Sequence, residues 1–215
     1  MNFNTKFWNW TILIALALIW GSSFILMKRG LDVFTSGQVA GLRMFIAFIF
    51  ILPFSFKYIK ARDLKNWKGF LGIGLFGKFI PAFLFTLAET GISSSLTGML
   101  NSLTPFFTLI IGVLFFQAKT NRIKVIGIVI GLIGAIGLLI PDKFSDLGTN
   151  ISYGGFVVIA TMSYGLSVNF IKTYTSNVHS IATACWAMLL VGPFGGIYLL
   201  STDISSTIHH PLFGE

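Results

Sequence analysis

The chain has 215 residues, of which 54% are hydrophobic and only 10% are charged. Ordinary soluble domains carry about 25% charged residues, so the composition excludes a soluble fold and indicates a lipid environment. The formal net charge of +8 does not indicate a nucleic-acid partner. The basic residues stand in short gaps between apolar runs, not along one face of a polar helix. We therefore expect the lipid bilayer as a partner and no nucleic acid.

Seven apolar runs are long enough to cross a bilayer, which takes about 20 residues. In chain order they lie at 9–28, 36–56, 67–88, 93–116, 123–140, 152–172 and 180–200. All seven are expected to be helices, because an open strand leaves backbone groups unpaired in lipid. The predicted fold class is all-α, a polytopic transmembrane helix bundle.

The basic residues divide unequally between the two sides that these spans define. One side holds ten: Lys6, Lys57, Lys60, Arg62, Lys65, Lys68, Lys119, Arg122, Lys124 and Lys172. The other side holds Lys28, Arg29 and Lys143. Because basic residues favour the cytoplasmic side, we predict a cytoplasmic N-terminus, and the odd number of spans then places the C-terminus outside.

Pairs of glycines four residues apart predict places where helix backbones approach closely. Three such pairs occur: Gly37 with Gly41, Gly127 with Gly131, and Gly192 with Gly196.

Motifs for cofactors and catalysis are excluded. Residues 72–77 fit the GxGxxG pattern, but they lie inside a span, with no strand before them and no acid about 20 residues later. The sequence has no Walker A motif, no HExxH motif and one cysteine. We expect no cofactor, no metal site and no catalytic residue.

Two basic residues lie within spans, where charge is costly and therefore suggests function. Lys78 is eleven residues into its span, roughly 16 Å deep at 1.5 Å per residue, where insertion costs about 2.5–3.5 kcal/mol. It needs a water-filled cavity, a carbonyl, a further helix or an anionic substrate. Arg43 lies roughly 10 Å from the outer end of its span, with Glu89 or Asp32 as candidate partners. Structural and substrate-binding roles stay open for both.

Other polar or aromatic residues lie at similar depth in at least four helices, which favours a central cavity. Asn101 precedes Pro105, which frees a carbonyl and predicts a broken helix. The hydroxyl of Ser23 can also bond its own helix, and the rings of Trp20 and Tyr164 can also serve packing. The predicted substrate-binding residues are Trp20, Ser23, Arg43, Lys78, Asn101, Pro105, Tyr164 and Asn169.

An internal repeat is suggested by a shift of 144 residues. This shift places Trp20-Gly21 on Tyr164-Gly165 and Lys28 on Lys172. Five spans separate the two copies, so they cross the membrane in opposite directions, as in the inverted repeats of secondary transporters.

The segment Trp20-Gly-Ser-Ser-Phe24, followed by Lys28 and Arg43, resembles the opening of an EamA domain of the drug/metabolite transporter superfamily. Residues 94–107 resemble the fourth helix of that family, and residues 127–137 resemble its glycine-rich fifth helix. The resemblance implies ten helices in two inverted five-helix repeats, and export or exchange of small metabolites such as amino acids by alternating access without ATP. It also implies a bacterial inner membrane.

Two departures from the family pattern stand out. The usual Gly-Glu pair after the fourth helix is replaced by Phe116-Gln117-Ala118, and residue 215 corresponds to residue 71 of the first repeat. We expect residues 1–145 to form the first repeat and residues 146–215 part of a second, with about seven of ten helices present. A complete transporter would need roughly 75 further residues by the repeat arithmetic.

Three functions compete at this point. The leading hypothesis is a secondary transporter of a small-molecule substrate, for which Lys78 favours a carboxylate. A membrane enzyme would need a catalytic cluster near an interface, and none is seen. A non-catalytic scaffold or receptor, or an inactive truncated transporter, is the remaining alternative, and a homodimer is left open.

Overall fold

The structure is a computed structural model that describes residues 6–138, 140 and 147–203. These residues form helices and connections without a strand, which confirms the predicted all-α class. The helices are α1 (Lys6–Gly30), α2 (Ser36–Tyr58), η1 (Ala61–Asn66), α3 (Trp67–Gly74), η2 (Leu75–Phe79), α4 (Ile80–Gly91), α5 (Ser94–Asn101), α6 (Thr104–Phe116), α7 (Arg122–Leu138), α8 (Leu147–Tyr174) and α9 (Ser180–Leu200).

Six helical segments within the described residues are long and apolar enough to cross a membrane. They correspond to six of the seven predicted spans: Lys6–Gly30, Ser36–Tyr58, Asp63–Gly91, Ser94–Phe116, Gly148–Tyr174 and Ser180–Leu200. The seventh, predicted at 123–140, is covered by α7, which has 17 residues. Lys143 and the predicted repeat boundary at 145/146 lie outside the described residues.

The third span runs continuously through η1, α3, η2 and α4 and widens in its middle. η2 is a π-helical turn, in which the amide of Ile80 donates to the carbonyl of Leu75, five residues earlier. Pro81 follows immediately and has no amide hydrogen to donate. The wider turn absorbs this missing hydrogen bond, and such turns are frequent at functional sites.

The fourth span is broken, as its proline predicted. α5 ends at Asn101, and α6 begins at Thr104 with Pro105 in its first turn. Between them, the amides of Ser102 and Leu103 donate to carbonyls three residues earlier, a tighter turn than the α-helix.

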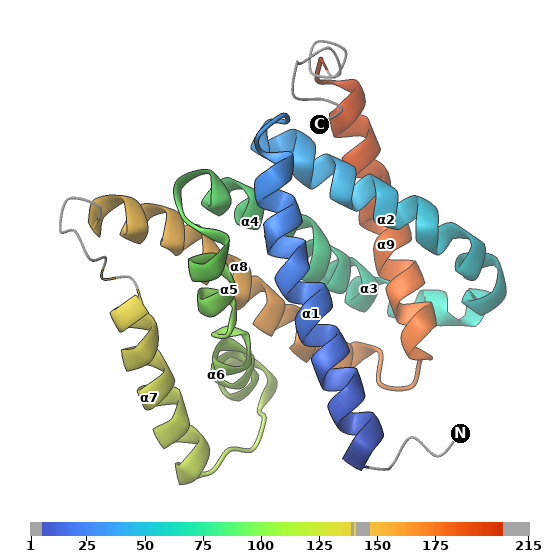
Figure 1. Cartoon of the computed structure of the whole chain (residues 1–215). Coiled ribbons are helices and arrows are strands. Elements are labelled where there is room, and N and C mark those ends of the chain that lie inside the picture. The colour runs from blue at the N-terminus through green and yellow to red at the C-terminus, as the bar shows by residue number, and fades with distance from the viewer. Residues whose placement is uncertain (1–5, 139, 141–146, 204–215) are drawn as a thin grey trace.

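The close contact between α2 and α9 explains two of the three glycine pairs. The two helices lie against each other along the bundle (Figure 1). A Cβ added at Gly41 would lie 3.2 Å from the carbonyl oxygen of Gly195, and one added at Gly192 would lie 2.5 Å from the Cβ of Phe48. The prediction is wrong at Gly127 and Gly131 for this chain, because nothing lies within 4 Å of a Cβ added there. These two glycines belong to α7, which stands at the edge of the bundle in Figure 1.

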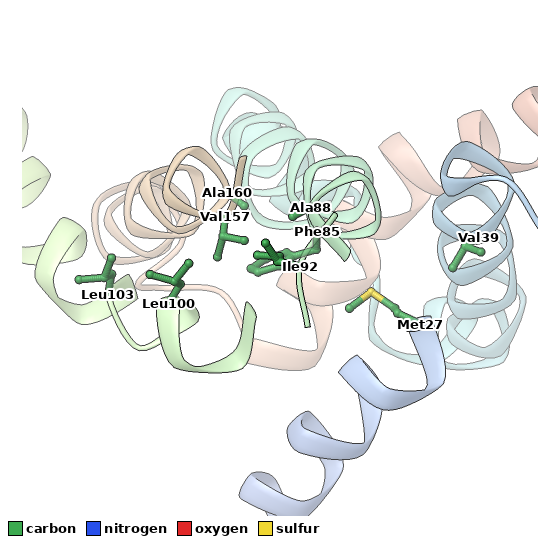
Figure 2. Close-up of a cluster of buried hydrophobic side chains, with 9 residues drawn as sticks. All are labelled: Met27, Val39, Phe85, Ala88, Ile92, Leu100, Leu103, Val157 and Ala160. Carbon is green, nitrogen blue, oxygen red and sulfur yellow. The ribbon is translucent and has the colours of Figure 1, made fainter. Parts of the chain in front are cut away.

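The main apolar core gathers around α4 and α8. Figure 2 shows its nine buried side chains, contributed by α1, α2, α4, α5 and α8 and by the connections next to α4 and α5. Phe85 and Ala88 of α4 face Val157 and Ala160 of α8 in this core, and Met27 reaches it from α1. The core therefore holds together the helices that carry the polar residues described next.

Candidate functional site

Arg43 connects α2 to α1. A capping box fixes the start of α2, since the Thr35 hydroxyl accepts from the amide of Gln38 and the Gln38 side chain accepts from the amide of Thr35. Two turns later, the half-buried guanidinium of Arg43 donates to the hydroxyl of Ser23 over 3.4 Å and to the sulfur of Met27. Two of the five donors of the guanidinium are used in these bonds, so others are free for a further acceptor.

Glu89 stands in the last turn of α4 and is fully buried, with 0% of its surface exposed. Neither of its carboxylate oxygens has a hydrogen-bond partner among the described residues. The ammonium group of Lys28 lies close by, but it donates to backbone carbonyls instead: 2.5 Å to Glu89 and 3.3 Å to Ile92. Lys28 thereby caps the C-terminal end of α4, where a cation is favourable.

Five residues from four helices make up what we call the Arg43 cluster: Ser23, Lys28, Arg43, Glu89 and Tyr164. Arg43 interacts electrostatically with both Glu89 and Tyr164. The ring of Tyr164 is held against Phe85, with the two centroids 5.7 Å apart. The cluster therefore places two cations, one carboxyl group and two hydroxyl groups against the apolar core.

Asn169 lies in a second polar contact, away from the Arg43 cluster. It is 4% exposed, and its amide group donates to the carbonyls of Thr108, at 2.9 Å, and Gly165, at 2.8 Å. The bond to Thr108 fastens α8 to α6 below the break that Pro105 introduces, whereas the bond to Gly165 lies within α8. Asn101, on the other side of this break, accepts from the Thr104 hydroxyl through its carbonyl, 2.9 Å, and its side chain, 3.3 Å.

Two predicted site residues stand on the surface of the described chain. Lys78 lies on the π-helical turn in the middle of the third span and is exposed. No described residue forms a hydrogen bond or ion pair with its ammonium group. Trp20 is 62% exposed on α1, three residues before Ser23. The structure therefore brings together Ser23, Arg43 and Tyr164, and leaves Lys78 and Trp20 apart from them.

One cavity of about 230 Å³ lies between α6 and α7, and its lining is apolar apart from Thr120. The lining of this cavity contains no charged side chain and a single hydroxyl group, so it does not suit a polar metabolite. Within the part of the chain that the structure describes, no three His, Cys, Asp or Glu side chains are grouped as a metal site would require.

Two members of the cluster did not appear among the predicted site residues. Glu89 was predicted only as one of two candidate partners of Arg43, and the structure favours it over Asp32, which is exposed. Lys28 was predicted as the last residue of the first span, at 9–28. Its role depends on where α4 ends, and the signal for that end was available in Gly91 and in Ser93, which caps α5.

Comparison with known proteins assigns a family to most of the chain. Residues 7–140 match the model of the EamA-like transporter family. No solved structure matches the chain.

Curated relatives carry transporter names. An "Uncharacterized transporter" of Archaeoglobus fulgidus is 27% identical over 84% of this chain and 63% of its own length. A "Probable amino-acid metabolite efflux pump" of Salmonella typhimurium is 26% identical over 82% of this chain and 57% of its own length. The "Uncharacterized inner membrane transporter YedA" of Escherichia coli K12 is 28% identical over 77% of this chain and 52% of its own length. The chain thus spans between about half and two thirds of these relatives.

Proposed function

Because this chain belongs to the EamA-like transporter family, we propose that it acts in secondary transport, exporting or exchanging small metabolites such as amino acids across the cytoplasmic membrane by alternating access. A relative named as a probable amino-acid metabolite efflux pump supports this substrate class. The division of basic residues supports a cytoplasmic N-terminus.

The Arg43 cluster is the observation that carries the proposal. Charged groups are costly at membrane depth and mark substrate or ion pathways. Arg43 has donors to spare, and the planar guanidinium suits a carboxylate, which it binds through two parallel hydrogen bonds. The two cations of the cluster, Lys28 and Arg43, outnumber its single carboxyl group, which favours an anionic group as the incoming ligand.

Lys78 is proposed as a second contact for the anionic group, at a different step of transport. Its ammonium group has no partner among the described residues, and it stands on a π-helical turn next to two glycines, Gly74 and Gly77. Trp20, Asn101, Pro105 and Asn169 complete the proposed substrate path. Asn169 and Pro105 shape the α6–α8 side of this path, while Trp20 presents an aromatic face.

An export assay in cells tests this function. Bacteria that express the chain are loaded with dipeptides, and the amino acids released into the medium are quantified over time. Wild-type expression should raise the release of at least one amino acid, and both Arg43→Ala and Lys78→Ala should lower it. Asp32→Asn, at an exposed acid outside the cluster, is the matched control. Release equal to that of cells without the protein would favour a scaffold or receptor instead.

A further inference from the structure

The carboxyl group of Glu89 is buried without the hydrogen bonds that a permanently ionised carboxylate would need. Transferring an ionised carboxylate out of water is costly unless it is paired and hydrogen-bonded. Glu89 is 0% exposed, and both of its oxygens lack a hydrogen-bond partner among the described residues. A buried polar group left unsatisfied in this way needs an explanation.

The neighbouring cations make this arrangement more unusual. Arg43, on α2, directs its hydrogen bonds to Ser23 and Met27, while Lys28, on α1, donates to two backbone carbonyls. Both cations are close enough to interact electrostatically with Glu89, yet neither forms a salt bridge with it. A neutral carboxyl group needs no such partner, so this conformation suits the protonated form.

Of the groups on the other packed elements, the Ser94 hydroxyl interacts with the Glu89 carboxyl group, but it carries no charge that would balance an ionised carboxylate. On α5, the Ser94 hydroxyl donates to the carbonyl of Phe24 at 3.3 Å. On α8, Tyr164 interacts with Arg43. On η2, Lys78 stands eleven residues before Glu89, roughly 16 Å along the helix. A metal cation is disfavoured because Lys28 and Arg43 would repel it, whereas a bound proton leaves a neutral group.

We propose that Glu89 is a proton-binding site that couples transport to the proton gradient. A proton from solvent binds one carboxylate oxygen of Glu89, which leaves Arg43 free to bind the carboxylate of a substrate. When the substrate leaves, Glu89 releases the proton to solvent, and its ionised carboxylate takes the place of the substrate next to Arg43. The proton and the substrate carboxylate therefore bind and leave together, so export of the substrate down its own gradient carries a proton in the same direction. The coupling rests on the proposed transport function, whereas proton binding at Glu89 does not.

Infrared spectroscopy tests the proton site without a substrate. The purified chain in vesicles of phosphatidylethanolamine and phosphatidylglycerol is titrated with acid, and the carboxylic-acid C=O band is followed. One band component should be missing in Glu89→Gln and retained in Asp32→Asn. Glu89→Asp, which keeps the carboxyl group, should retain a component with a shifted midpoint. A titration of the C=O band that is unchanged in a folded Glu89→Gln protein would overturn the proposal. Loss of the component assigned to Glu89 in both Glu89→Asp and Asp32→Asn would also overturn it, because the component would then not report Glu89 specifically.

Flux in the same vesicles tests the coupling. Labelled L-leucine and L-leucinamide, which lacks the carboxylate, are compared with and without a pH gradient. A gradient of one pH unit should change L-leucine accumulation by up to about tenfold in the wild type, and Glu89→Gln should remove this dependence. Accumulation that ignores the gradient would overturn the coupling. Absence of flux together with the expected infrared result would overturn the transport function and leave the proton site standing.

Discussion

The contact between α6 and α8 can be tested by adding a single methyl group. In Gly165→Ala, the new Cβ would lie 2.7 Å from the amide nitrogen of Thr108 and 2.8 Å from the carbonyl carbon of Phe107. Both neighbours are backbone atoms, which cannot rotate away. Restoring ordinary contact, which begins at 3.4 Å, requires the helices to separate by about 0.7 Å.

This separation lowers the free energy of unfolding in two ways. Overpacking of this kind costs about 1–3 kcal/mol. The shift also stretches the 2.9 Å hydrogen bond from Asn169 to Thr108, and a hydrogen bond between membrane helices contributes about 0.6–1.7 kcal/mol. Replacing glycine by alanine within a helix returns about 0.5–1 kcal/mol. We therefore expect Gly165→Ala to lower the free energy of unfolding by about 1–4 kcal/mol.

The assay is reversible unfolding of the purified chain in mixed micelles, in which the fraction of denaturing detergent is increased stepwise. Gly155→Ala is the matched control on the same helix, because nothing lies within 4 Å of a Cβ added at Gly155. It should leave stability unchanged or raise it by up to about 1 kcal/mol. Equal effects of the two substitutions would refute the close packing of α6 on α8.

Three further predictions concern other parts of the chain. Asn169→Leu should lower the free energy of unfolding by about 1–2 kcal/mol, because the carbonyl of Thr108 on α6 and that of Gly165 on α8 lose the side-chain amide that donates to them. Unfolding in mixed micelles measures this change. Gln117→Gly should raise the free energy of unfolding by about 1 kcal/mol in the same assay, because Gln117 ends α6 with a φ of 53°, where a residue with a side chain is strained. The control Gln117→Ala keeps a Cβ at this position and should not raise it. Arg43→Lys should weaken transport of a carboxylate substrate by about tenfold in KM, since a lysine cannot form two parallel hydrogen bonds; equal KM values would contradict the guanidinium contact.

The helices themselves could be predicted from the sequence because lipid leaves few choices. An apolar run of about 20 residues must satisfy its own backbone, and this fixes both its structure and its minimum length. Pro105 also correctly predicted the break in the fourth span. In contrast, the π-helical turn at residues 75–79 was not foreseen, since Pro81 alone does not say whether a helix will kink, break or widen.

The Arg43 cluster was only partly predictable. Depth along a helix singled out Arg43 and Tyr164, but depth does not tell which face of each helix meets a neighbour. Trp20 was ranked with them for its depth, yet α1 turns it outward in this chain, where it is 62% exposed. Glu89 stands one residue beyond the predicted span at 67–88, and its burial became visible only with the packing of α4 against α8.

Counterflow in proteoliposomes tests the central claim of transport most directly. Vesicles that contain the purified chain are loaded with unlabelled amino acids, diluted into buffer with a trace of one labelled amino acid, and sampled over time. We predict a transient accumulation of label for at least one amino acid, absent in vesicles without protein and reduced in Arg43→Ala. Label that enters protein-containing and empty vesicles equally, for every amino acid, would contradict transport by this chain.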